Sequence, residues 1–126
     1  MQQAPHYQNV VKEVADFLIA RAHACLSAGI ALERIVIDPG FGFGKTVEQN
    51  FTLLRELGVL TQTGYAVLAG FSRKASLGSI TGRAPDDRLA ASLATALIAL
   101  QNGASIIRVH DVKETVDVLK VWLAAR

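Results

Sequence analysis

The sequence predicts an α/β fold built on a parallel sheet, and two observations lead to this class. Three short apolar runs, at residues 35–37, 67–69 and 106–107, each break off into a charged or glycine-rich segment. Each run is followed by apolar residues at helical spacing. Consecutive strand–helix units join through right-handed crossovers, which makes their strands parallel. In such folds the loops at the carboxyl ends of the strands carry the functional groups.

The composition excludes several classes of protein. The chain has 126 residues, which is one domain at most, and its 51% hydrophobic content predicts a buried core. A net charge of +2 with no basic cluster argues against a nucleic-acid partner. No apolar stretch approaches the roughly 18 residues of a membrane span, and residues 1–5 lack the features of a signal peptide. We therefore expect a cytoplasmic protein without a membrane partner, with the single Cys25 as a small core residue.

The first half of the chain predicts two helices around one strand. A helix is expected at residues 7–28, before Gly29. Its apolar face consists of Val11, Val14, Leu18, Ala22 and Cys25. A strand is expected at residues 34–38, and a T-x-x-Q capping box then opens a helix over residues 46–60.

The middle of the chain predicts a second strand and a third helix. The strand is expected at residues 66–71, and residues 76–84 are expected to be irregular. The Pro-Asp-Asp run at 85–87 suits a first helical turn, and Asn-Gly at 102–103 ends that helix. Its apolar face consists of Leu89, Leu93, Ala96, Leu97 and Leu100.

The last strand and helix complete the pattern. The strand is expected at residues 105–109, and Asp111 with Glu114 caps a final helix. The residues expected to point inward from this helix are Val112, Val116, Leu119 and Leu123. Three aromatic side chains are expected to be packing residues: Phe17, Phe51 and Trp122.

The predicted order is α-β-α-β-α-β-α, with about three parallel strands and four helices. The strands start 32 and 39 residues apart, at positions 34, 66 and 105, without a sequence repeat. A sheet of three parallel strands has exposed edges and needs cover on both faces. The chain also opens on a helix with no strand before it. Residues 1–126 therefore predict the C-terminal portion of a TIM-type (β/α)8 barrel, which takes about 250 residues in full.

The first strand ends in a glycine-rich loop, residues 38–45, with the sequence DPGFGFGK. It is not a P-loop, because Pro39 stands where that motif needs glycine, and its G-x-G-x-G spacing is not the dinucleotide fingerprint. A plain turn remains the alternative, since Asp-Pro-Gly is common in turns. The phenylalanines that alternate with the glycines favour a functional role for this loop over a plain turn. We expect the Asp38 carboxylate to accept two parallel N–H bonds from a ring edge, Phe43 to form a packing wall, and Lys45 to be solvated.

The second strand ends in Gly70-Phe71-Ser72-Arg73-Lys74, which places two cations and a hydroxyl together. Adjacent side chains diverge, so one cation faces a pocket and the other covers it. An ordinary basic pair on the surface is the alternative.

The third strand carries Arg108 and His110, which are two apart and so project to one face of the sheet. A guanidinium fork beside an imidazole suits a phosphate group. The alternative is a structural ion pair with Asp111, although that residue is better used as a helix cap.

These motifs, together and in this order, resemble the dihydropteroate synthase family, within the wider pterin-binding family. The resemblance covers nearly the whole chain. Its motifs are MQ-x-AP-x-Y at residues 1–7, the loop 38–45, Ser-Arg-Lys at 72–74, DRL at 87–89, SLA at 92–94 and RVHDV at 108–112.

The resemblance implies a condensation in folate synthesis. 6-Hydroxymethyl-7,8-dihydropterin pyrophosphate reacts with p-aminobenzoate to give 7,8-dihydropteroate and pyrophosphate. The bond to pyrophosphate loosens first in the family, and the arylamine then attacks a cationic pterin methylene.

The resemblance also implies roles for eight residues. Four would be catalytic: Asp38 would hold the nitrogen edge of the pterin, Lys74 would donate to the pterin and position the second substrate, and Arg108 and His110 would hold the departing pyrophosphate. Four would bind substrate. Gly70 would allow close approach, while the p-aminobenzoate site, where sulfonamides compete, would be lined by Phe43, Ser72 and Arg73.

The family has further segments before the residues matched here, including an asparagine associated with magnesium. Mg2+ is therefore expected for the complete enzyme, although residues 1–126 contain no obvious metal ligand set. We expect the isolated chain to be inactive or weak, and its partner to be a complementing N-terminal half or a second copy. Two alternatives remain: a pterin methyltransferase, and a non-catalytic half-barrel that self-associates.

Overall fold

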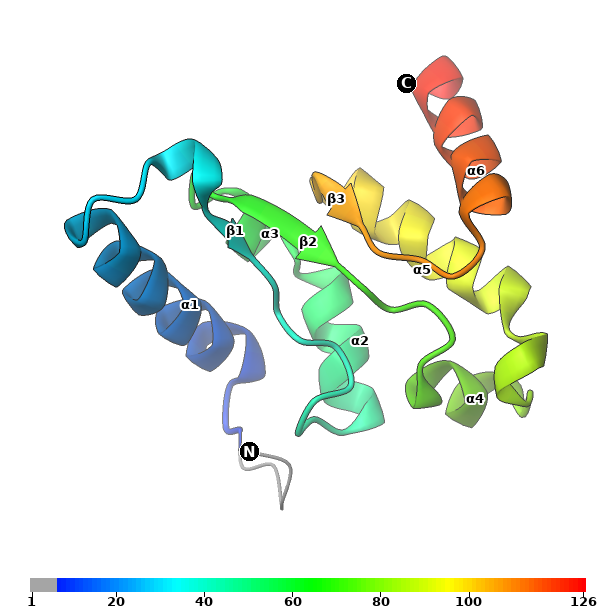
Figure 1. Ribbon diagram of the computed structural model, residues 1–126. Coiled ribbons are helices and arrows are strands. Elements are labelled where there is room, and N and C mark those ends of the chain that lie inside the picture. Colours follow the sequence, from blue (N-terminus) through cyan, green and yellow to red (C-terminus); the bar gives the residue numbers. More distant parts are fainter. Residues whose placement is uncertain (1–6) are drawn as a thin grey trace.

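The computed structural model describes residues 7–126, which form three short parallel strands backed by helices (Figure 1). The strands are β1 (Val36–Ile37), β2 (Ala66–Ala69) and β3 (Ile106–Ile107), in that order across the sheet. Val36 pairs with Ala66, and Leu68 pairs with Ile106, both in parallel register. The α/β class and the three parallel strands are thus confirmed. The MQ-x-AP part of the first motif lies outside the described residues.

The four helices that the sequence predicts are present, together with shorter ones. The α-helices are α1 (Val10–Ser27), α2 (Val47–Arg55), α3 (Gly58–Thr61), α4 (Ala75–Thr81), α5 (Leu89–Gln101) and α6 (Val112–Ala125). Two 3-10 turns are η1 (Leu32–Arg34) and η2 (Pro85–Asp87). No helix in residues 7–126 is long and apolar enough to cross a membrane.

The three strands are shorter than the expected ranges 34–38, 66–71 and 105–109, and two further predicted segments were wrong. The helix expected over 46–60 breaks after Arg55 and resumes as α3, because the chain turns to bury both Leu57 and Leu60 completely. The segment expected to be irregular forms α4. There Ser76 and Leu77 are buried, and Gly82 ends the helix in the left-handed region at φ +74°.

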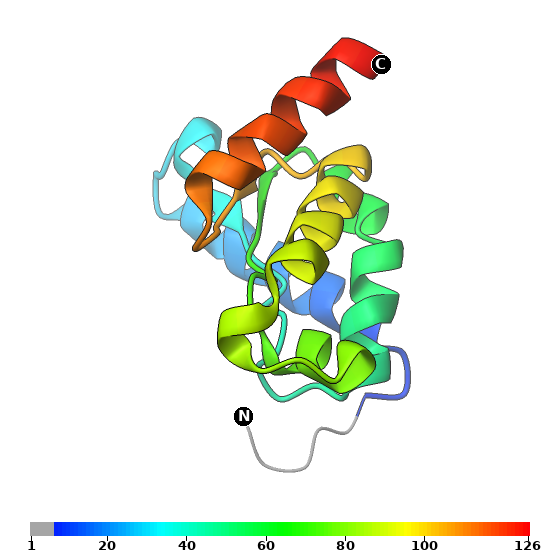
Figure 2. The ribbon, with the colours of Figure 1, turned by 90° about the vertical axis from the view of Figure 1, so that its right-hand side faces the viewer.

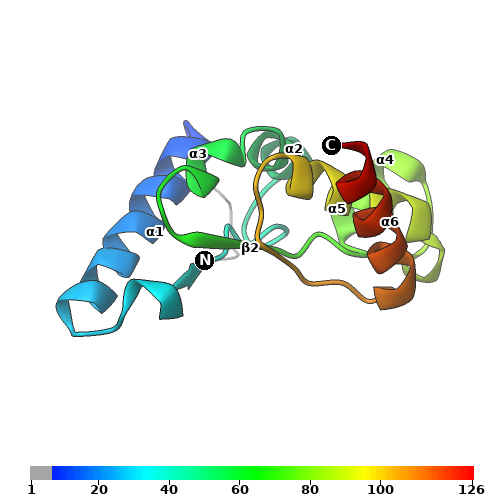
Figure 3. The same ribbon diagram turned by 90° about the horizontal axis from the view of Figure 1, so that it is seen from above.

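The sheet has one covered face and one open face. Ile37, Val67 and Ala69 are buried beneath the helices, whereas Val36 and Ile106 on the opposite face are 44% and 41% exposed. Seen from above, α1, α2, α3 and α5 all lie on one side of the strands (Figure 3). No helix or strand among residues 7–126 covers the other side, which corresponds to the interior of a barrel.

The core lies between the sheet and α1, α2 and α3. Leu53, Leu54, Leu57 and Leu60 are almost entirely inaccessible to solvent, and the Phe41 ring lies 4.7 Å from that of Phe71. The predicted face of α1 is buried at Val11, Val14 and Ala22, while Leu18 and Cys25 are half-buried against the same core. Phe51 also packs there, 5.2 Å from Phe71.

The predicted face of α5 was partly wrong. Small residues face the core and permit a close approach: Ser92, Thr95, Ala96 and Ala99 are buried beside Leu100. Leu89 is exposed, and Leu93 and Leu97 line an apolar groove between α5 and α6.

The predicted inward face of α6 was also wrong, because this helix packs mainly against α5 and extends beyond the rest of the molecule (Figure 2). Thr115 is buried, whereas Val112, Val116 and Leu123 are exposed. Phe17 on α1, expected to be a packing residue, is 64% exposed. These apolar side chains have no cover among residues 7–126.

Candidate functional site

The loops that follow the three strands leave the sheet at the same edge, where the arrowheads in Figure 1 point. A cavity of about 820 Å³ lies at this edge between the loops after β2 and β3. Six of the eight predicted site residues line it: Gly70, Ser72, Arg73, Lys74, Arg108 and His110. Asp86 of η2 also lies at its rim, so one acid faces several cations.

Arg108 lies directly against the end of β2. A Cβ atom on Gly70 would lie only 3.3 Å from Arg108 Nε, and the Arg108 amide donates to the Ala69 carbonyl at 3.0 Å. The glycine therefore provides the space in which the guanidinium crosses the strand. On the other face of β3, Ile107 packs against the core, as the two-residue alternation predicts.

His110 is tied to the loop after β2. Its Nδ1 lies 2.8 Å from Ser72 Oγ, and its backbone N–H donates to the same oxygen at 3.3 Å. Ser72 is buried, whereas His110 is exposed at the cavity.

Arg73 makes a second link between the loops after β2 and β3. Its guanidinium donates to Asp111, with Nη2 at 2.8 Å from Oδ1. The expected side-chain cap at Asp111 was therefore wrong: its carboxylate makes no cap hydrogen bond, and it pairs with Arg73 rather than with Arg108 or His110. The Thr115 amide bonds to the Asp111 carbonyl instead.

The backbone at Arg73 is left-handed, with φ +56°, which is costly for a residue with a side chain. Three contacts hold it there. The Arg73 amide donates to Ser92 Oγ at 2.9 Å, its carbonyl accepts from Arg88 Nη1 at 2.8 Å, and its guanidinium is paired with Asp111. This turn sends Arg73 toward the loop after β3 and Lys74 toward the loop after β1.

Lys74 connects the cavity to the glycine-rich loop. Its ammonium group donates to the Phe41 carbonyl and lies 4.8 Å from the centre of the Phe43 ring. Burial lowers the pKa of Lys74; nearby Asp38 opposes this shift, while Arg108 adds to it. Phe43 itself is half-exposed and forms a wall beside the ammonium group.

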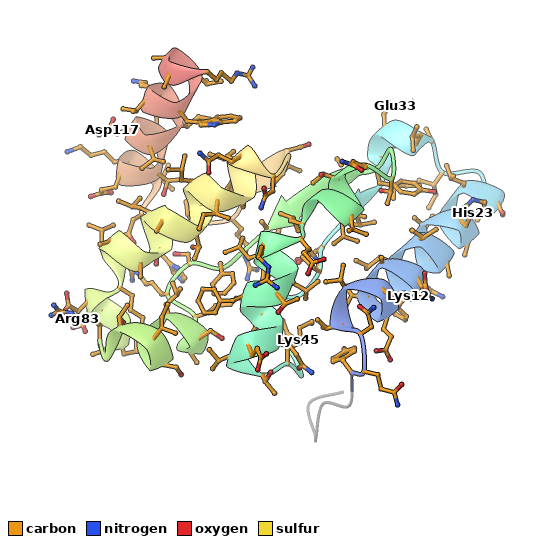
Figure 4. All side chains as sticks on the ribbon, turned by 180° about the vertical axis from the view of Figure 1, so that it is seen from behind. Lys12, His23, Glu33, Lys45, Arg83 and Asp117 are labelled. Carbon is orange, nitrogen blue, oxygen red and sulfur yellow. The ribbon has the colours of Figure 1, made fainter. Side chains whose placement is uncertain are left out.

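Asp38 and Lys45 organise the glycine-rich loop. Asp38 Oδ1 accepts the Gly40 N–H at 2.8 Å, while Lys45 donates to the carbonyls of Gly40 and Phe43 at 2.8 and 3.0 Å. The expectation of a solvated Lys45 was wrong: it is half-buried beside the start of α2 (Figure 4). Burial lowers its pKa, and Asp38 again opposes the shift. The Asp38 and Lys45 side chains line a neighbouring hollow rather than the main cavity.

Asn50 is a residue that the sequence analysis missed. It is 1% exposed; its Oδ1 accepts the Gly42 N–H at 2.8 Å, and its Nδ2 donates to Ser76 Oγ at 2.9 Å. It therefore links the glycine-rich loop to the start of α4, directly after Lys74. The sequence does hold a sign of this role. Position 50 lies three and four residues before Leu53 and Leu54, so its amide side chain shares the buried face of α2 with them.

This arrangement suits an anionic ligand with polar ring edges. Cationic and imidazole groups surround the cavity, and the exposed Asp38 carboxylate lies in the neighbouring loop. In the part of the chain that the structure describes, no three histidine, cysteine or acidic side chains lie together as a metal site.

Replacing Asn50 with alanine should lower the free energy of unfolding by about 1–3 kcal/mol, because the Gly42 amide and the buried Ser76 hydroxyl lose their partner. Urea unfolding followed by circular dichroism measures this change. Gln101→Ala, an exposed amide on α5, is the matched control and should change stability far less. Equal effects would show that the Asn50 bridge contributes nothing.

Replacing Asp38 with asparagine should lower the pKa of both Lys45 and Lys74 further, because it removes the negative charge that raises them. Side-chain NMR titration measures both values. Asp16→Asn is the control: it should lower only the pKa of Lys12, which its Asp16 partner raises. If the pKa values of Lys45 and Lys74 did not change, the charge of Asp38 would be too far from both lysines to raise them.

Comparison with known proteins shows the family of the chain. Residues 1–110 match the model of the family described as pterin binding enzyme. Dihydropteroate synthase of Haemophilus influenzae is 52% identical over 124 residues, which are 98% of this chain and 45% of that protein. The chain thus spans less than half the length of this relative.

Solved structures show the same likeness. Xanthomonas albilineans dihydropteroate synthase with 4-aminobenzoic acid superposes with a TM-score of 0.94 at 53% identity, covering 97% of this chain and 45% of that one. The same enzyme in complex with 7,8-dihydropteroate gives 0.95 at 52% identity, covering 99% and 48%. The expected barrel architecture and the resemblance to this family are confirmed, and the chain belongs to the pterin-binding enzyme family.

Proposed function

We propose that the chain is the C-terminal part of a dihydropteroate synthase. The whole enzyme would join 6-hydroxymethyl-7,8-dihydropterin pyrophosphate to p-aminobenzoate, forming 7,8-dihydropteroate and pyrophosphate. The carbon–oxygen bond to pyrophosphate breaks, a carbon–nitrogen bond forms, and the amine loses a proton. The observation that carries the proposal is the convergence of Lys74, Arg108 and His110 on one cavity.

The largest catalytic effect would come from the cations around the leaving group. Negative charge builds on pyrophosphate as its bond to the pterin breaks, and fixed donors at that point stabilise the transition state. Arg108 supplies a planar fork of donors and His110 an imidazole, and Gly70 lets the guanidinium lie close to the strand. These groups are already in place before the charge develops.

Asp38 would receive the pterin. Its Oδ1 already accepts one N–H from its own loop, which fixes the direction of the carboxylate, and the group remains exposed for a second partner. Two parallel acceptors match the amidine-like edge of a pterin ring. Lys74 would donate to the same ring from the opposite loop, since it is held beside Phe43.

The p-aminobenzoate site would be formed by Phe43 and the segment from Ser72 to Lys74. Arg73 contributes there through its backbone and the stem of its side chain, because its guanidinium is engaged by Asp111. Sulfonamides would compete at this place. The names of the relatives, at 52–53% identity, favour the synthase over the pterin methyltransferase.

The isolated chain would be inactive or weak by this proposal. The open sheet face at Val36 and Ile106 requires cover, which a complementing N-terminal half or a second copy would provide. Magnesium remains an expectation for the complete enzyme. The acids described here include no ligand cluster that fits it, so no step is assigned to the metal.

The proposal predicts dihydropteroate formation when the chain is joined to the N-terminal part of the Haemophilus influenzae relative. In that chimera, Arg108→Gln should lower kcat/KM by about 10- to 100-fold or more, the effect of losing a charged hydrogen bond in the transition state. Arg83→Gln is the control, because Arg83 is an exposed arginine after α4 that pairs with Asp87.

Two outcomes would contradict the proposal. A chimera that unfolds cooperatively but forms no product would refute the synthase assignment. Turnover by the isolated chain near that of an ordinary synthase would instead refute its incompleteness.

A further inference from the structure

Ser72 and His110 form a close polar contact at the cavity. The Ser72 hydroxyl oxygen lies 2.8 Å from Nδ1 of the imidazole and also accepts the backbone N–H of His110 at 3.3 Å. Ser72 is only 7% exposed, so its hydroxyl has little access to water. Within residues 7–126, His110 supplies both of the hydrogen-bond partners of this hydroxyl.

This geometry distinguishes the two neutral forms of the imidazole. The backbone N–H of His110 can only donate, so Ser72 Oγ accepts there and its own hydrogen is left to be donated. If Nδ1 is bare, the hydroxyl hydrogen bonds to it. If Nδ1 carries the hydrogen, the hydroxyl hydrogen has no acceptor among residues 7–126, in a nearly buried position where a missing partner is costly. The contact therefore favours the form with its hydrogen on Nε2.

We propose that Ser72 is a positioning residue that holds His110 with its hydrogen on Nε2, so that the imidazole donates to an anion in the cavity. The identity of that anion as pyrophosphate rests on the proposed function. The form of the imidazole does not. This role adds to the one that the family resemblance implied for Ser72, because its hydroxyl is directed to His110.

The consequence for binding follows from the charges around the cavity. Lys74 and Arg108 line the same space and attract a phosphate group, while Asp86 lies at the rim and Asp111 is engaged by Arg73. An Nε2–H group adds a donor to this set. An Nε2 lone pair would instead face the phosphate oxygens and repel them. The His110 imidazole can carry its hydrogen on either nitrogen, and the contact with Ser72 fixes it as a donor at Nε2.

The test uses the chain labelled with 15N-histidine, with the His110 signals assigned through their loss in His110→Gln. At about pH 9, where an ordinary imidazole is neutral, the spectrum should show a protonated Nε2 and a hydrogen-bonded bare Nδ1. Ser72→Ala should give a mixture of both forms, and Ser72→Thr, which keeps the hydroxyl, should restore the wild-type spectrum.

Calorimetry with inorganic pyrophosphate gives the second measurement. Ser72→Ala should bind about 2- to 10-fold more weakly than the wild type, the effect of one hydrogen bond. Ser79→Ala is the control, since Ser79 is an exposed serine of α4 that bonds only to the Ala75 carbonyl. Circular dichroism checks that each variant is folded.

The outcomes separate the two claims. A wild-type His110 with its hydrogen mainly on Nδ1 would overturn the inference, whatever the variants do. Unchanged pyrophosphate affinity and spectrum in a folded Ser72→Ala variant would overturn the role of Ser72. A wild-type chain that binds no pyrophosphate would contradict the anion site of the proposed function, and the spectrum would still decide the form of the imidazole.

Discussion

The short segment after β2, residues 72–74, connects the loops that form the candidate site. On one side, Lys74 reaches the Phe41 carbonyl of the glycine-rich loop; on the other, Ser72 and Arg73 bind His110 and Asp111 after β3. Parallel pairing brings the three strand ends to one edge, but pairing alone leaves their loops free to diverge. These contacts join the loops into one surface, and the left-handed backbone at Arg73 directs the side chains to both neighbours.

This surface brings together cations that repel one another, and the cost of doing so appears in the pKa values of two lysines. Burial and mutual repulsion lower the pKa of Lys74 and Lys45, so both lysines oppose folding while they are charged. This opposition is complete below their folded pKa values and fades as the pH rises toward 10.5. Asp38 relieves part of it, and a bound anion would relieve more. A destabilised cation at a cavity, as Lys74 is here, is typical of a site built for a negatively charged ligand.

The sequence predicted the strands, their parallel direction and the residues at their ends, because burial and glycine-rich turns leave strong local patterns. It failed where contacts between distant segments decide the outcome. Asp111 resembles a helix cap in the sequence but pairs with Arg73. Lys45 resembles a solvated lysine but donates a hydrogen bond to the Gly40 carbonyl within its own loop. The inward face of α6 could not be predicted either, since its apolar pattern does not reveal that α5 is its main packing partner.

The central claim is that the loops after β2 and β3 build one receptor for an anion at the edge of the sheet. A crystal structure of the chain grown with inorganic pyrophosphate tests it most directly. The account predicts pyrophosphate between the Arg108 guanidinium and the imidazole of His110, within hydrogen-bond distance of both. Pyrophosphate bound elsewhere, for example along α6 at Lys113 and Lys120, with the cavity beside Arg108 free of it, would contradict the account.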